Sequence, residues 1–117
     1  MELAYRPVAE FDPRAADVAV VSWPRWQGID PEDNLHGAPE LVIEIKSPTN
    51  TNRELRELAS LCLANGGLEF WIADIAQRSF TVIRRDGSTT LYQSGQSIPL
   101  TLVGAEAIAV DELFAVS

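Results

Sequence analysis

Cysteine, histidine and lysine each occur only once in this chain of 117 residues. A single cysteine, Cys62, excludes an internal disulfide and a zinc cluster built from thiolates. A single histidine, His36, likewise excludes a metal site made of several imidazoles. Any metal ion that the chain binds is therefore expected to be held by oxygen atoms.

Long apolar runs are also missing. No run approaches the roughly 18 residues needed to span a bilayer, and Met1 to Glu10 has neither the basic start nor the apolar middle of a signal peptide. We therefore expect no membrane contact and a cytoplasmic location. Because 46% of the residues are hydrophobic, the chain can build one packed core, and a single domain over residues 1–117 is expected.

Positive charge is scarce as well. Nine Lys and Arg residues face 17 Asp and Glu residues, which gives a formal net charge of −8. This balance disfavours a plain DNA-binding protein, because such affinity comes mainly from basic side chains that displace phosphate counterions. It is compatible with carboxylates that hold divalent cations, since a bound cation reverses the local sign of the charge.

Strand patterns surround one amphipathic helix. The expected strands are 17–22, 40–46, 68–74, 79–85, 89–93 and 98–102. A capping box at residues 51–54, followed by apolar residues at helical spacing and by Gly66-Gly67, predicts a helix of ~14 residues. Residues 29–39 are expected to form a loop, 86–87 a hairpin turn and 110–114 a short helical turn. The expected fold is α/β or α+β, with a mixed central sheet and one principal flanking helix.

The strand at 40–46 carries two charged side chains among aliphatic neighbours. Because strand side chains alternate, Glu44 and Lys46 should project from one face while Ile43 and Ile45 point into the opposite core. Lys46 is the only lysine, and its compact ammonium differs chemically from the guanidinium of the eight arginines. Two interpretations stay open: part of a metal-dependent active site, or a salt bridge at the rim of the sheet worth ~0 to 1 kcal/mol.

Three segments in order carry a family resemblance: 17–21, then 39–50 with the following helix, then 68–74 with the hairpin after it. This order resembles the Uma-type endonuclease family, formerly a domain of unknown function, which belongs to the PD-(D/E)XK restriction-endonuclease-like superfamily. The resemblance covers roughly residues 15–115, and its most specific part is residues 40–50. It implies a restriction-endonuclease-like fold and hydrolysis of phosphodiester bonds, with DNA as substrate and a homodimer as the expected assembly.

The resemblance also implies a set of active-site residues. Asp17 stands at the position of the first metal-binding Asp of the superfamily, Glu44 at the second acidic ligand and Lys46 at the motif lysine. With the backbone carbonyl of Ile45, the two carboxylates would hold Mg²⁺ or Mn²⁺, which prefer oxygen ligands. Lys46 would then orient or deprotonate the attacking water and stabilise charge on the phosphate.

The chain departs from the family pattern in three ways, of which the least important is that Ala16, not proline, precedes Asp17. Family members usually carry an N-terminal helix before the first Asp, whereas sixteen residues precede Asp17 here and offer only Glu2 or Glu10 as an acidic substitute. This shortened N-terminus suggests that a second subunit completes the site. Many members also carry their lysine on the following helix, at about the place of Leu58, instead of at the Lys46 position.

Further candidates for phosphate contact lie next to the motif. Ser47, Arg53 and Arg56 could meet a nucleic-acid backbone near the site. The alternative, which we favour for the two arginines, is pairing with Glu57 and Glu54 on an exposed helix face.

Four more residues could serve a nucleic-acid site. Arg84 and Arg85 allow the same two interpretations as the helix arginines. Trp23 and Trp26 could stack on a base, although packing on the core or on a dimer partner is favoured. Cys62 lies on the apolar stripe of the helix and is expected to be inert core.

The function expected from the sequence is a Mg²⁺- or Mn²⁺-dependent nuclease. One alternative is a nuclease fold that has lost catalysis and binds a protein partner. Another is a module that binds nucleic acid without cutting it, which predicts a steep dependence of affinity on salt.

Overall fold

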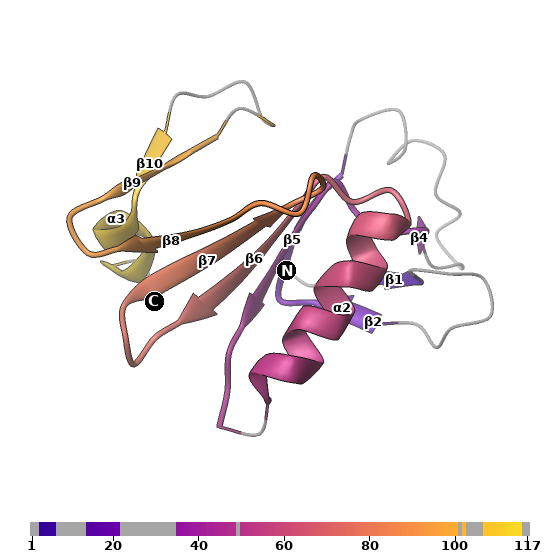
Figure 1. The fold of residues 1–117 in the computed structure, drawn as a ribbon, viewed down its shortest axis with the longest axis horizontal. Coiled ribbons are helices and arrows are strands. Elements are labelled where there is room, and N and C mark those ends of the chain that lie inside the picture. Colours follow the sequence, from indigo (N-terminus) through magenta and orange to yellow (C-terminus); the bar gives the residue numbers. More distant parts are fainter. Residues whose placement is uncertain are drawn as a thin grey trace.

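Apolar strand segments form a mixed five-stranded sheet in this computed structural model, which describes residues 3–6, 14–21, 35–48, 50–100, 102 and 107–115. Two neighbouring strands, β5 (Leu41–Ile45) and β6 (Glu69–Asp74), run parallel, and the other neighbours in this sheet are antiparallel (Figure 1). In spatial order the strands are β3 (Val18–Val20), β5, β6, β7 (Ser79–Arg84) and β8 (Thr89–Gln93). The sheet confirms the predicted mixed architecture.

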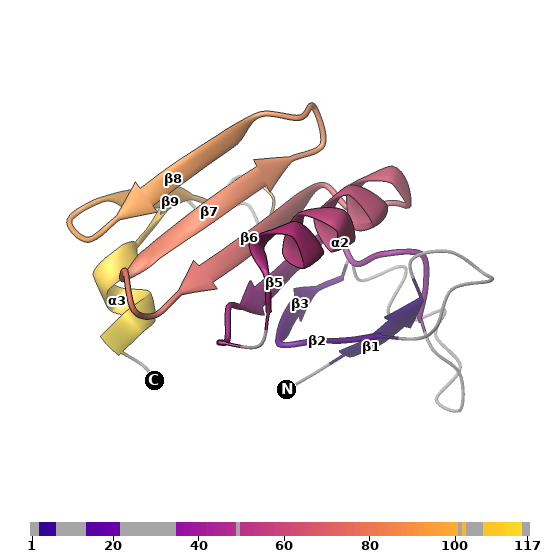
Figure 2. The same ribbon diagram turned by 60° about the horizontal axis from the view of Figure 1, so that its bottom comes forward.

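The predicted helix is α2 (Asn52–Ala64), which joins the two parallel strands. It begins as the capping box indicates, because the Thr51 hydroxyl accepts a hydrogen bond from the Glu54 amide at 3.0 Å. It ends before Gly66, which adopts φ +106°, and the Gly67 amide donates to the Cys62 carbonyl at 2.9 Å. Figure 2 shows α2 lying across one face of the sheet.

Each face of the sheet packs its own core. On the α2 face, the buried helix residues Leu55, Leu58, Ala59 and Cys62 meet Val42, Phe70 and Ile72 of the sheet. The buried Cys62 confirms its predicted place in the core. The opposite core contains Leu41, Trp71, Ala73, Phe80, Val82, Ile98 and Val110. The β5–β6 part of the main sheet is thus covered on both faces, so in this part polar groups can gather only at the strand ends.

The opposite core is closed by C-terminal elements. These are β9 (Ser97–Pro99) and β10 (Ala107–Ala109), which form a two-stranded antiparallel sheet, and α3 (Val110–Ala115). α3 confirms the predicted helical turn. The strand predicted at 98–102 does not join the main sheet, because Ile98 is fully buried in the opposite core and pairs with Ile108 instead.

A second small sheet is formed by N-terminal segments that the sequence did not reveal. It consists of β1 (Leu3–Arg6), β2 (Arg14–Ala16) and β4 (Leu35–His36), in the order β2-β1-β4. The loop predicted at 29–39 is therefore wrong at Leu35–His36, since these two residues pair in parallel with β1. Residues 29–34 and the two tryptophans Trp23 and Trp26 lie outside the described residues.

Neither described helix has the length and apolarity that a membrane span requires; α2 has 13 residues and α3 has six.

Candidate active site

The pairing of β3 with β5 brings two acidic residues to the same end of one strand ladder. Val18 pairs with Ile43 and Ala19 with Val42, and extending this antiparallel register by one step would bring Asp17 level with Glu44. Asp17 itself is a bend residue between β2 and β3, not part of the strand predicted at 17–22. The pairing ends at Val18 and Ile43, so Asp17 and Glu44 each lie one residue beyond it, at the same end of the β3–β5 ladder.

A hydrogen bond fixes the Asp17 carboxylate beside the motif strand. Its Oδ2 accepts from the Ile45 amide at 2.8 Å. In a longer β3 this amide would face the backbone of Ala16, but β3 begins only at Val18, and the carboxylate supplies the missing acceptor. A hydrogen bond to an ionised acceptor is stronger than a neutral one, so it holds the side chain at this point. It uses Oδ2 and leaves Oδ1 outside the bond.

Glu44 and Lys46 emerge on the α2 face of the sheet. Val42 packs in the core beneath α2, whereas Ile43 packs in the opposite core, and alternation carries this pattern forward along β5. The predicted place of Ile43 is confirmed. The prediction for Ile45 is wrong, since this residue is 43% exposed at the end of β5, beyond the last residue that β3 pairs with.

Lys46 extends the parallel ladder and meets an acidic residue that the sequence did not single out. Its amide donates to the Ala73 carbonyl at 2.8 Å, and the register places it level with Asp74. The Lys46 Nζ lies 4.0 Å from Asp74 Oδ2, with the two side chains 32% and 27% exposed. Such a long, partly solvated ion pair adds little stability.

Asp74 is itself held in place by the turn that follows β6. Its Oδ1 accepts a hydrogen bond from the Gln77 amide at 3.1 Å while Oδ2 faces Lys46. Sequence reasoning placed Asp74 at the end of a strand but had no means to set that strand beside Lys46. The signal that could have found it is the helix between two apolar strands, which indicates parallel neighbours with their carboxyl ends at one edge.

Residues 3–113 match the family described as "Putative restriction endonuclease", named Uma2. The chain belongs to the Uma2 family. Its fold is also that of a solved structure described as a putative nuclease belonging to DUF820 from Anabaena variabilis ATCC 29413, with a TM-score of 0.79 and 20% sequence identity. That match covers 98% of this chain but 66% of the other, so a third of the solved protein has no counterpart here. Among curated proteins no relative matches.

In this Uma2 chain the segment between β5 and α2 is a tight polar turn. The Asn50 side chain oxygen accepts from the Ser47 hydroxyl at 2.6 Å and from the Ser47 amide at 3.2 Å, and the Asn50 amide donates back to the Ser47 carbonyl. These bonds lead the backbone from Lys46 directly to the helix cap at Thr51. Ser47 thus supports the position of the motif, and its contact with nucleic acid stays a prediction.

The two arginines near the start of α2 have different surroundings. Arg53 Nε lies 3.1 Å from Glu57 Oε1, one helical turn further on, and its side chain is 88% exposed. This is the helix-face pair that the sequence favoured. Arg56 instead lines a groove on the α2 face.

The donor atoms present are those that a hard divalent cation prefers. Within the described ranges, no group of three or more His, Cys, Asp and Glu side chains is placed to hold a metal ion. The candidate metal ligands proposed from the sequence are not three side chains: they are two carboxylates, Asp17 and Glu44, and the backbone carbonyl of Ile45. Mg²⁺ and Mn²⁺ are commonly bound by one or two carboxylates and keep their other positions for water and substrate phosphate. The residues therefore fit such an ion.

Proposed function

We propose that this Uma2 chain hydrolyses phosphodiester bonds of nucleic acid, with DNA as the substrate, using Mg²⁺ or Mn²⁺ held by Asp17, Glu44 and the Ile45 carbonyl. One observation carries the proposal: the Asp17 carboxylate accepts a hydrogen bond from the amide of Ile45, the residue between Glu44 and Lys46 in the sequence. The family description and the fold of the solved nuclease support it.

Each residue has a distinct task in this proposal. Asp17 and Glu44 provide negative charge and oxygen ligands, and the hydrogen bond to Ile45 orients the first of them. A bound ion would lower the pKa of a water molecule and neutralise charge on the phosphate. Lys46 donates a hydrogen bond to a non-bridging phosphate oxygen as the oxygen of the attacking water bonds to phosphorus and loses its proton to solvent. The P–O bond to the leaving oxygen breaks in the same step, and that oxygen takes up a proton from solvent. Asp74 holds the Lys46 ammonium in the required direction.

The test is a cleavage assay with purified protein on plasmid and on single-stranded DNA, with Mn²⁺, with Mg²⁺ and with a chelator. We expect cutting only with metal, and a loss of at least about 100-fold for Lys46→Ala and for Glu44→Gln. Both variants should melt within a few degrees of the parent, since both side chains lie at the end of β5. Wild-type protein that neither cuts nor binds Mn²⁺ in calorimetry would refute the proposal and favour a nuclease fold that serves as a binding module.

We also propose that the active form is a homodimer, because two copies can cut the two strands of a duplex. Light scattering coupled to gel filtration tests this directly. A monomer that cuts duplex DNA at full rate would contradict it.

A further inference from the structure

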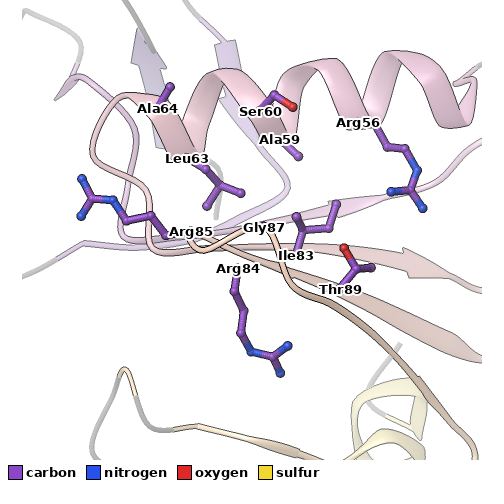
Figure 3. Close-up of a pocket in the computed structure, with 10 residues that line it drawn as sticks. All are labelled: Arg56, Ala59, Ser60, Leu63, Ala64, Ile83, Arg84, Arg85, Gly87 and Thr89. Carbon is purple, nitrogen blue, oxygen red and sulfur yellow. The ribbon is translucent and has the colours of Figure 1, made fainter.

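A groove runs between α2 and the β7–β8 hairpin. α2 contacts β6 and packs over the β5–β6 part of the sheet, whereas Leu91 of β8 is 52% exposed. The uncovered part forms a hollow of about 430 Å³. Its lining residues are Arg56, Ala59, Ser60, Leu63, Ala64, Ile83, Arg84, Arg85, Gly87 and Thr89 (Figure 3). The groove therefore opens on the same sheet face as Glu44 and Lys46.

Two arginines stand at opposite ends of this groove. Figure 3 shows Arg56 projecting from α2 at one end and Arg85 from the hairpin at the other. The floor between them is apolar and includes Leu63 and Ile83, while Thr89 adds a hydroxyl group. This layout combines positive ends with a surface on which a flat or aliphatic group can rest.

The arginine next to Arg85 has a different task. Arg84 points away from α2 in Figure 3 and donates hydrogen bonds to the Thr90 hydroxyl at 2.9 Å and the Tyr92 hydroxyl at 3.0 Å. Alternation along the strand explains the difference, because neighbouring residues face opposite sides of the sheet. The two interpretations left open for Arg84 and Arg85 thus separate: the first braces β8, and the second faces the groove.

Arg56 and Arg85 also differ from the other basic side chains described. The remaining ones have acidic or hydroxyl partners: Lys46 with Asp74, Arg53 with Glu57, Arg78 with Asp111, and Arg84 with its two hydroxyls. Among the described side chains, Arg56 and Arg85 make no ion pair within 4.0 Å. Their guanidinium groups are therefore available to an external anion.

Within the described part of the chain, the groove is lined by three arginines and by no acidic residue, although the chain as a whole is acidic. Asp86 in the adjoining turn is the nearest acidic residue in sequence to Arg85, and its Oδ1 accepts from the Ser88 amide at 2.8 Å. Glu57, next to Arg56 in sequence, is engaged by Arg53. In a chain of net charge −8, two unpaired guanidinium groups on one groove mark the place where an anionic ligand is least repelled.

The spacing fits a strand that carries phosphates at intervals. Arg56 and Ala64 both line the groove and are eight residues apart on α2, which corresponds to about 12 Å at the helical rise. At ~3.4 Å per nucleotide along one strand, this length takes roughly three to four nucleotides. Guanidinium groups suit phosphate because they donate two parallel hydrogen bonds to it.

We propose that this groove binds the sugar-phosphate backbone of a nucleic-acid strand, with Arg56 and Arg85 as its phosphate contacts. The inference rests on the proposed function and adds to it the path of the substrate strand, beside α2 and across β7 and β8. Both arginines are positioning residues, since they lie outside the set of Asp17, Glu44 and Lys46.

The experiment measures binding apart from cleavage. Fluorescence anisotropy follows a labelled 20-nucleotide DNA strand, in chelator and at several salt concentrations, with wild type, R56Q/R85Q and R53Q. We expect the double variant to bind about tenfold or more weakly and the slope of log affinity against log salt to fall by roughly one per arginine. R53Q removes one positive charge from the helix that carries Arg56, outside the groove, and should stay within about threefold of wild type.

The outcomes separate this inference from the proposed function. Equal affinity and salt slope for R56Q/R85Q and wild type, in variants with unchanged melting, would overturn the groove assignment. The assignment would also be overturned if the wild type bound no DNA strand. It would likewise be overturned if binding of a poly-glutamate peptide required the two arginines and binding of DNA did not. A wild type that binds through the arginines but cuts nothing with Mn²⁺ would leave the groove assigned and defeat the nuclease proposal.

Discussion

At the scale of single residues, the Asp17 carboxylate has both a structural and a chemical task. One oxygen completes the hydrogen bonding of the Ile45 amide, and the proposal gives the carboxylate a share of a metal ion. Removing the charge and removing the acceptor are different changes, and they can be made separately.

Asp17→Asn keeps an oxygen that can accept from Ile45 and removes the negative charge. We expect Mn²⁺ affinity to fall by at least about tenfold with little change in melting temperature. Asp17→Ala removes the acceptor as well and should destabilise the fold by ~1 to 2 kcal/mol. Calorimetry and thermal unfolding read the two effects independently. Unchanged Mn²⁺ binding in Asp17→Asn would remove this residue from the ligand set.

Asp74 gives a second prediction at this scale. If it acts by orienting Lys46, Asp74→Asn should lower the kcat of DNA cleavage by roughly three- to tenfold and leave KM nearly unchanged. The double variant Lys46→Ala, Asp74→Asn should be no slower than Lys46→Ala alone, because residues that act as a unit are not additive. Steady-state kinetics on the four proteins supply the measurement. Additive losses would show that Asp74 acts on the reaction by a separate route.

At the scale of elements, the cap of α2 controls how the helix begins after the motif strand. Thr51→Ala removes the acceptor for the Glu54 amide and should reduce the free energy of unfolding by about 1 kcal/mol. Thr51→Ser keeps a hydroxyl oxygen and should recover most of the loss. Urea denaturation measures both variants. Equal stability of Thr51→Ala and the parent would mean that tertiary packing alone sets the start of α2.

Local signals predicted the elements that depend on local contacts. The cap at Thr51, the glycine pair after α2 and the Asp86-Gly87 turn each specify their own neighbourhood, and the structure has all three features. β1, β2, β4 and β10 were not predicted, because each is only two to four residues long and too short to show a strand pattern. β4 also forms by pairing with β1, far away in the sequence.

The candidate site likewise has a part that local signals predicted and a part that depends on contacts between separate segments. Alternation along β5 was enough to place Glu44 and Lys46 on one face, opposite Ile43. The position of Asp17 at the same end of the β3–β5 ladder as Glu44 rested on a family resemblance, since antiparallel pairing between separate segments leaves no local trace. The contact of Lys46 with Asp74 needed the parallel register of β5 and β6 and was missed.

At the scale of the whole molecule, one contact that is sensitive to acid joins α3 to the β8–β9 turn. The Asp111 carboxylate accepts from the Ser94 hydroxyl at 2.6 Å and the Gly95 amide at 3.1 Å, and Arg78 lies 4.0 Å away. The Ser94 bond, with smaller help from Gly95 and Arg78 and against partial desolvation, holds the Asp111 pKa below its usual value of 3.8. A similar bond from Ser88 lowers the pKa of Asp86.

The sign of the pH effect follows from that direction. A carboxylate whose folded pKa is lowered adds stability above its unfolded pKa, and this is lost as the pH falls through the folded value. The melting temperature of the wild type should therefore drop as the pH falls below about 4. The Asp111→Asn variant should melt at a lower temperature at neutral pH and lose less of it in acid. Circular dichroism melts from pH 7 to pH 3 test this. A variant with the same acid sensitivity as wild type would assign the effect to other groups.

The bend at Asp17 also joins the two larger sheets, because β2 belongs to the N-terminal one and β3 to the central one. A cation bound by Asp17 and Glu44 would therefore link the junction of the two sheets to β5. Detaching the first hairpin would leave Glu44 and Lys46 in place on β5 and take away the other half of the ligand set. Cleavage activity would then depend on the N-terminal sheet staying packed against the central sheet.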